Sequence, residues 1–167
     1  MKIYLIGMPL SGKSTIGKRL AEELRFQFID LDIYVEKTYE INIDDMLKNG
    51  HEDLFRALET DALKEILNMT DVVVATGGGI VLSDENYDFM DGLTIFLDVK
   101  IQELKKREKT AKKRPLLDNE DALSKTYRER IELYYSFADI IITETNIDEI
   151  INEIIDTLYE EGFLWKL

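Results

Sequence analysis

Short apolar runs that alternate with amphipathic segments constrain the fold of this chain more than any other sequence feature. The runs are Ile3–Ile6, Phe28–Leu31, Val72–Ala75, Leu93–Leu97 and Ile140–Thr143. Runs of this length, separated by helical patterns, indicate short strands that are buried on both faces. Such strands predict an α/β fold of three layers, in which a five-stranded parallel sheet is covered by helices on both sides.

The segments between the runs carry apolar residues at helical spacing. Two predicted helical faces are Leu54, Leu58, Ala62 and Ile66, and Ile147, Ile150, Ile151, Ile154 and Leu158. Such faces pack against a sheet. In open parallel sheets, ligands bind beyond the carboxyl ends of the strands, so residues that directly follow a strand are the candidates for a binding site.

Length and composition indicate a single globular domain over residues 1–167. No apolar run approaches the roughly 20 residues needed to span a bilayer. A chain without cysteine cannot form a disulfide scaffold, and it fits a reducing compartment, so we expect a cytoplasmic protein. The net charge of −13 repels nucleic acid and anionic membranes, and we expect neither as a partner.

The sequence GMPLSGKS at residues 7–14 fits the phosphate-binding pattern G-x-x-x-x-G-K-[ST], between a predicted strand and a predicted helix. Its glycines allow backbone N–H groups to surround phosphate oxygens at the positive end of the helix dipole. In this pattern Lys13 reaches the β- and γ-phosphates and Ser14 is a ligand of Mg²⁺. The predicted nucleoside triphosphate site consists of Gly7, Ser11, Gly12, Lys13, Ser14 and Thr15. The pattern leaves the second substrate open.

Two carboxylates lie at the end of the second predicted strand. Asp30 and Asp32 stand two residues apart, and within a strand this spacing points both side chains to the same face. One acid near Mg²⁺ and one near the hydroxyl that accepts a phosphoryl group would suit a kinase. Alternatively, one of the two acids caps the following helix, which the sequence allows equally well.

A run of three glycines, residues 77–79, follows the third predicted strand, and it would let a substrate approach the backbone closely. Upstream of it, Arg56 lies on a predicted helix with Glu59 three residues later, a spacing that places the two side chains on neighbouring faces. Taken alone, such a pair is most commonly an ion pair on the surface.

Together these motifs resemble the shikimate kinase family over nearly the whole chain, and they occur in the family's order. They are GMPLSGKST (7–15), FIDLD (28–32), LFRALE (54–59), TGGG (76–79), RPLL (114–117) and R-x-x-x-Y (130–134). Many enzymes share the phosphate loop, but the combination with the other motifs is much more specific. The resemblance implies a P-loop kinase fold with strand order 2-3-1-4-5. It also implies transfer of the γ-phosphate of ATP, with Mg²⁺, to the 3-hydroxyl of shikimate, in aromatic amino-acid biosynthesis.

The resemblance implies how the acceptor would be held, within a helical region of about residues 32–60 and beyond. Asp32 would bind the hydroxyls of shikimate and act as the base for the attacking one. Arg56 and Arg130 would grip its carboxylate, for which the planar, paired donors of arginine are suited. The pocket would be lined by Gly77, Gly78 and Gly79.

On the nucleotide side, the resemblance implies that Asp30 holds the Mg²⁺ shell together with Ser14. Arg107 would pack near the adenine, and Asn146 falls in the stretch that resembles the adenine loop. Both substrates, shikimate and ATP, would be bound by one chain, and we expect a monomer.

The catalytic residues that the resemblance implies are Asp32, Lys13 and Arg114. Arg114 would belong to a mobile lid of about residues 108–119, which would close over the transferring phosphoryl group and exclude water. On composition alone this lysine-rich segment would be a surface loop, whereas the resemblance favours a lid.

Two positions depart from the family pattern. Leu10 stands where many relatives carry glycine, so we expect a slightly stiffer phosphate loop. Glu132 lies between Arg130 and Tyr134, where relatives often have proline, and its charge would attract Arg130 and alter the affinity for the acceptor.

The same motifs disfavour other functions. A gluconate kinase would share the phosphate loop but not the FRxxE and TGGG pair. A nucleoside monophosphate kinase would need an extra base pocket and a lid rich in arginines, whereas this chain has the glycine turn and two separated arginines that suit a carboxylate. A catalytically silent ATP-binding module would be expected to lose the acceptor carboxylate or the lid arginine, and both are present. A metal enzyme is disfavoured because His51 is the only histidine, and we expect it on the surface.

Residues 162–167 include Phe163 and Trp165, and we expect this tail to pack against the sheet or a neighbouring helix.

Overall fold

The computed structural model describes residues 1–110 and 122–163. Five strands form one parallel sheet in the order β2-β3-β1-β4-β5. They are β1 (Lys2–Ile6), β2 (Gln27–Asp30), β3 (Val72–Ala75), β4 (Leu93–Leu97) and β5 (Ile140–Ile142). The predicted sheet and its strand order are confirmed, and each strand end lies within one residue of the apolar run that predicted it.

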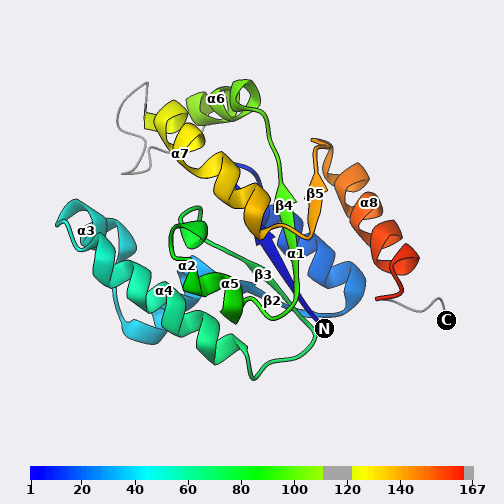
Figure 1. Cartoon of the computed structure of the whole chain (residues 1–167), viewed down its shortest axis with the longest axis horizontal. Helices are drawn as coiled ribbons and strands as arrows, with labels where there is room; N and C mark the ends of the chain where they lie inside the picture. The colour runs from blue at the N-terminus through cyan, green and yellow to red at the C-terminus, as the bar shows by residue number, and fades with distance from the viewer. Residues whose placement is uncertain (111–121, 164–167) are drawn as a thin grey trace.

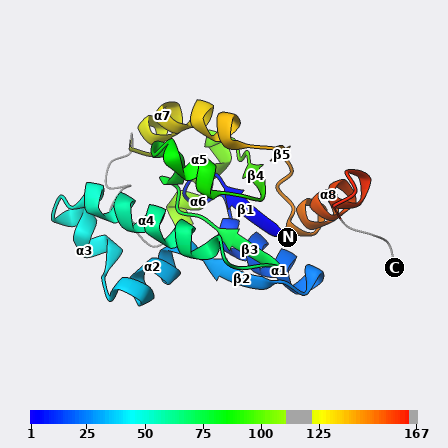
Figure 2. The same ribbon diagram turned by 60° about the horizontal axis from the view of Figure 1, so that its bottom comes forward.

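Helices cover both faces of this sheet. They are α1 (Lys13–Leu24), α2 (Leu31–Tyr39), α3 (Ile43–Lys48), α4 (Glu52–Ile66), α5 (Glu85–Phe89), α6 (Ile101–Thr110), α7 (Ala122–Phe137) and α8 (Ile147–Glu160), with a short 3₁₀ helix η1 (Ile80–Leu82). Figures 1 and 2 show α1 and α8 on one side of the sheet and α4, α5 and α7 on the other. None of the described helices is long and apolar enough to cross a membrane.

The central strand β1 divides the core in two. Ile3 and Leu5 join a cluster with apolar residues of α1 and α8, whereas Tyr4 and Ile6 join a cluster with residues of α4 and α7. All four side chains are fully buried. Successive side chains of a strand point to opposite faces, so a strand that is apolar throughout requires cover on both sides.

The buried face of α4 differs from the predicted one. Leu54 is 55% exposed, whereas Phe55 and Glu59 are buried along with Ala62, Leu63 and Ile66. The first turns of α4 face a cavity lined by Phe55 and Glu59 rather than the sheet, and this shifts the buried stripe by one residue. The face of α8 was predicted correctly except at its first residue, Ile147, which is 41% exposed.

Two smaller expectations concern the surface. His51 is exposed immediately before α4, as predicted. Phe163 is 49% exposed, so this part of the tail is not packed away, and residues 164–167 lie outside the described residues.

The sheet order brings the candidate segments together. Because β2, β3 and β1 are parallel neighbours, the segments that follow them leave the sheet at the same edge. These segments are the start of α2, the glycine turn at 77–79 and the phosphate loop at 7–12.

Candidate active site

The phosphate loop curls between β1 and α1 around the ammonium group of Lys13. Lys13 Nζ donates hydrogen bonds to the backbone oxygens of Gly7 at 2.8 Å and Met8 at 2.9 Å, and the side chain is buried. Gly12 begins α1 with a φ of 97°, in the left-handed region that glycine favours. Leu10 also has a positive φ, 69°, which costs about 1–2 kcal/mol in a residue with a side chain.

Asp30 links the phosphate loop to the start of α2. Ser14 Oγ donates to Asp30 Oδ2 at 2.6 Å, and Asp30 Oδ1 accepts from the backbone N–H of Ile33 at 3.4 Å. Strand β2 ends at Asp30, so Asp32 belongs to the first turn of α2, and the expected placement of both acids on one strand face was wrong. The alternative that one acid caps the helix is confirmed for Asp30, because a side-chain oxygen there satisfies a helical N–H that lacks an intrahelical partner.

A cavity of about 660 Å³ lies beyond the carboxyl ends of these strands. It is lined by the predicted residues Lys13, Ser14, Thr15, Asp30, Asp32, Arg56 and Arg130, together with the three glycines of the turn. Its outer wall comes from α2, α3 and the start of α4 and includes Ile33, Glu36 and Leu47. The residues predicted for phosphate, metal and acceptor therefore face one common space.

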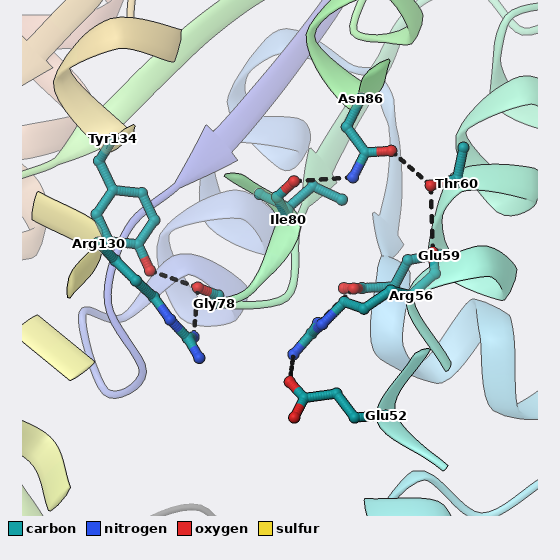
Figure 3. A network of polar contacts seen from close by, with 9 residues as sticks. All are labelled: Glu52, Arg56, Glu59, Thr60, Gly78, Ile80, Asn86, Arg130 and Tyr134. Carbon is teal, nitrogen blue, oxygen red and sulfur yellow. Dashed lines mark hydrogen bonds and ion pairs between the residues drawn. The ribbon is translucent and has the colours of Figure 1, made fainter. Parts of the chain in front are cut away.

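The Arg56–Glu59 pair lies in the wall of this cavity and not on the surface. Arg56 Nη1 bonds the carboxylate of Glu59, and Nη2 bonds Glu52 Oε1 at 3.0 Å (Figure 3). The Glu59 side chain is completely buried and that of Arg56 is 12% exposed, so the surface interpretation was wrong. Because both side chains are buried, neither can exchange its partner for water, and the ion pair keeps a fixed position in the wall of the site.

The glycine turn is shaped by close approach of these charged groups. At Gly79 a Cβ atom would overlap the guanidinium of Arg56. At Gly77 it would lie 2.5 Å from Glu59 Oε1 and 2.7 Å from Asp32 Oδ1. No residue larger than glycine fits these two positions without displacing a site residue, and the carboxylates of Asp32 and Glu59 meet over the same backbone atom.

Helix α7 supplies the opposite wall. Arg130 Nη1 donates to the backbone oxygen of Gly78 at 2.8 Å, and the hydroxyl of Tyr134 donates to the same oxygen at 2.5 Å (Figure 3). The Tyr134 ring stacks on Phe96 with ring centres 5.2 Å apart. Glu132 is exposed and forms no ion pair with Arg130 within the described residues, so the expected attraction between them is not observed.

A second cavity of about 270 Å³ lies on the outer side of the phosphate loop. Arg107 of α6 lines it, and its Nη1 donates to the backbone oxygens of Leu10 and Ser11, both at 3.2 Å. Both cavities are lined by Leu10, Gly12 and Thr15, so the phosphate loop forms the boundary between them. An extended ligand across the loop would contact both spaces.

Asn146 begins α8 beside this second cavity. Its side-chain oxygen accepts from the backbone N–H groups of Asp148 at 2.9 Å and Glu149 at 3.2 Å. The neighbours Thr145 and Ile147 line the cavity. By capping α8, the carboxamide of Asn146 holds the loop that carries them in place. Arg114 and residues 111–119 of the expected lid lie outside the described residues, and Glu108–Thr110 form the end of α6.

Comparison with known proteins relates this site to a protein family. The family model described as "Shikimate kinase" matches residues 9–159. The chain is 40% identical over 157 residues to shikimate kinase of Clostridium botulinum (strain Alaska E43 / Type E3), which covers 92% of this chain and 94% of that relative. The chain belongs to the shikimate kinase family.

Solved shikimate kinases share the whole fold. Shikimate kinase of Acinetobacter baumannii in complex with shikimate superimposes with a TM-score of 0.89 at 28% identity, covering 98% of this chain and 95% of that chain. Shikimate kinase of Aquifex aeolicus gives a TM-score of 0.84 at 36% identity, with 97% and 98% coverage. The predicted family, fold and enzyme class, an ATP-dependent kinase, are confirmed. None of the comparisons supports a gluconate kinase, a nucleoside monophosphate kinase or a silent module.

Two residues of this shikimate kinase's site were not assigned roles from sequence. Glu59 was seen only as a partner of Arg56, and Tyr134 only as a letter of the R-x-x-x-Y motif. The sequence could have predicted the place of Glu59, because an acid three residues after a site arginine on a helix can lie beside it in the same site. The contact of Tyr134 with Gly78 joins residues 56 positions apart, and no local pattern reports it.

Glu59 has an unusual electrostatic environment. Burial raises its pKa from 4.5 to about 7, and Arg56 opposes the rise, while the charge of nearby Asp32 adds to it. Burial is the largest single influence on the pKa of Arg56 and acts to lower it, but the charges and hydrogen bonds of Glu59 and Glu52 together outweigh it, so the pKa of Arg56 is raised overall. Arg56 therefore stays charged, while Glu59 exchanges a proton near neutral pH.

We predict that Glu59 makes stability fall as pH rises. A carboxyl whose pKa is higher in the folded chain stabilises the fold fully below pH 4.5, and this contribution is lost as pH rises to about 7. The loss in the free energy of unfolding is up to about 3 kcal/mol. Glu59→Gln should flatten the pH dependence between these limits in urea unfolding, whereas Glu22→Gln, at an exposed site, should leave it as in the wild type. Parallel wild-type and Glu59→Gln curves would contradict the prediction.

Proposed function

We propose that this shikimate kinase transfers the γ-phosphate of ATP to the 3-hydroxyl of shikimate, giving shikimate 3-phosphate and ADP, with shikimate in the larger cavity. The observation that carries this proposal is the convergence of two arginines, Asp32 and the phosphate-loop lysine on one space of about 660 Å³. In that space the arginines can donate hydrogen bonds to a carboxylate, Asp32 can accept a hydroxyl proton, and the lysine can bind phosphate.

The two arginines would bind the carboxylate of shikimate. Arg56 and Arg130 enter the cavity from opposite walls, and the Nε atom of each is buried without a hydrogen-bond partner among the described residues. A buried donor without a partner is unfavourable, and a carboxylate would satisfy it with a charge-assisted bond. The hydroxyl edge of the ring would then lie toward Asp32 and the phosphate loop.

Asp32 would accept the proton of the attacking hydroxyl. The hydroxyl oxygen forms a bond to the γ-phosphorus, the bond from that phosphorus to the bridging oxygen of ADP breaks, and the proton passes to the carboxylate. Lys13 would leave the backbone oxygens of the loop and turn to the β- and γ-phosphates. Phosphoryl transfer depends mainly on positioning and charge neutralisation, and these groups supply both.

Ser14 and Asp30 fit a Mg²⁺ ion that accompanies ATP. The hydroxyl of Ser14, at the start of α1, and the carboxylate of Asp30, at the end of β2, lie 2.6 Å apart. They supply the hard oxygen ligands that Mg²⁺ takes, and Mg²⁺ usually completes its shell with water and phosphate. The bound ion would neutralise charge on the phosphates.

The remaining site residues would complete the nucleotide side. The adenine would lie in the smaller cavity between Arg107 and the loop preceding α8, which Asn146 caps. Arg114 would close over the transferring phosphoryl group from the segment 108–119. We further propose that the enzyme acts as a monomer in the cytoplasm.

Release of ADP in a coupled assay with a panel of acceptors tests this function. We expect turnover with shikimate of about 1–100 s⁻¹ in the presence of Mg²⁺. Gluconate and nucleoside monophosphates should give background rates, because neither offers a carboxylate and a ring hydroxyl at the required separation. Turnover with one of these and none with shikimate would refute the proposal.

A further inference from the structure

We propose that Asn86 and Thr60 are positioning residues for the acceptor site. Their hydrogen bonds hold α4, which carries Arg56, at a fixed place against the glycine turn of residues 77–79. Neither side chain lines the cavity, so any effect on the acceptor passes through Arg56. The inference rests on the proposed function, since it concerns the affinity for shikimate.

Asn86 joins two segments that are distant in sequence. From α5, its Nδ2 donates to the backbone oxygen of Ile80 at 2.8 Å, and its Oδ1 accepts from Thr60 Oγ1 at 2.7 Å (Figure 3). Asn86 is 1% exposed and Thr60 3% exposed. Both hydrogen bonds of the Asn86 carboxamide are therefore buried, where a polar group without a partner is costly, and they fix the side chain in one orientation.

The bridge spans the contact between Arg56 and the turn. Ile80 directly follows Gly79, the glycine against which the Arg56 guanidinium lies. Thr60 stands one helical turn after Arg56, and its hydroxyl also lies 3.1 Å from the backbone oxygen of Arg56. Asn86 therefore links the backbone that follows Gly79 to the side chain of Thr60 on α4, and loss of this link would let α4 move relative to the turn.

The other contacts of the turn do not depend on this bridge. The backbone oxygen of Gly78 is held by Arg130 and Tyr134 from α7. A Cβ atom at Gly78 would lie 2.9 Å from Pro9 of the phosphate loop, so this side of the turn packs on the nucleotide site. Removing the bridge is therefore expected to shift Arg56 relative to Arg130 and to leave the nucleotide site in place.

A matched pair of variants at Thr60 tests the proposal in the intact enzyme. Thr60→Val removes the hydroxyl and keeps the shape, whereas Thr60→Ser keeps the hydroxyl. We expect Thr60→Val to raise the KM for shikimate about 10-fold, since a displacement on the order of 1 Å can reduce rates by up to about 10²-fold. The KM for ATP should stay within about twofold, and Thr60→Ser should restore the KM for shikimate to near the wild-type value.

Asn86→Leu should raise the KM for shikimate at least as much as Thr60→Val, because it removes the bond to Ile80 as well as the bond to Thr60. The double variant should add little to Asn86→Leu, because that change already removes the bond that Thr60→Val breaks. Tyr4→Phe is the control for general loss of stability. It removes the hydrogen bond of this fully buried tyrosine to Asp91, which lies just before β4 and therefore away from the carboxyl ends of the strands, and it should not change the KM for shikimate.

Three outcomes would overturn the proposal with the proposed function intact. They are an unchanged KM for shikimate in Thr60→Val, an equal rise in the KM for ATP, and the same rise in Tyr4→Phe. A wild-type enzyme that does not phosphorylate shikimate would instead overturn the proposed function, and this inference with it.

Discussion

Replacing Asp32 with asparagine is expected to lower kcat by about 10²–10⁴-fold, the range that a positioned general base contributes. The amide keeps the shape of the side chain, but it cannot take the hydroxyl proton, and its NH₂ group donates where the carboxylate accepted. The KM for ATP should change by no more than about twofold, because the contacts of the phosphate loop come from Lys13 and backbone groups. Steady-state kinetics with both substrates varied measures each constant.

Asp45→Asn provides the matched control for this variant. Asp45 is an exposed acid on α3 that does not line the cavity, so its neutralisation changes the net charge equally and leaves the site intact. Wild-type turnover in Asp32→Asn would show that Asp32 only holds the acceptor or supports the first turn of α2. A loss of ATP binding as large as the loss of kcat would indicate a disturbed phosphate loop instead.

Arg56→Ala is expected to have the largest effect on the binding of shikimate. Truncation removes one donor of the acceptor carboxylate and leaves Glu59 buried beside Asp32, so the cost to binding is about 2–5 kcal/mol. That is a loss of roughly 30-fold to several thousand-fold in affinity. Arg56→Lys should recover only part of it, because an ammonium cannot supply the paired donors of a guanidinium. Titration calorimetry with shikimate and, separately, with ATP measures both affinities.

Two further variants are controls for Arg56→Ala, one for the loss of a positive charge and one for the loss of stability. Arg128→Ala removes an exposed arginine of α7 and should leave the affinity for shikimate unchanged. The double variant Arg56→Ala, Glu59→Gln also removes the buried acid that has lost its partner, and it should recover stability without recovering affinity. If shikimate binds Arg56→Ala as tightly as the wild type, the carboxylate lies elsewhere.

These variants address how an enzyme with a net charge of −13 holds two anionic substrates. Attraction must be local, because the field of the whole chain repels anions. Lys13, Arg56 and Arg130 face the same cavity, and Arg107 lies against the outside of the phosphate loop. Their arrangement places positive charge at the carboxyl ends of the central strands.

The sequence by itself determined the strands and the chemistry of the phosphate loop. Five apolar runs predicted the strands to within one residue, because burial on both faces leaves a continuous apolar signal. The loop at 7–14 is a local structure, set by glycines and the following helix, and a local pattern reports it fully. The family's motif order then supplied the acceptor, which composition and periodicity could not.

Only the tertiary structure decided how the charged residues are used. The sequence left open whether Asp32 continues the strand or follows a capping residue, and in the structure the side chain of Asp30 caps α2, so that Asp32 lies in its first turn. The Arg56–Glu59 pair looks like a surface pair in sequence, and it is buried because the turn at 77–79 is packed against it. Burial of a charge depends on what covers it, and here the cover comes from segments tens of residues away in the chain.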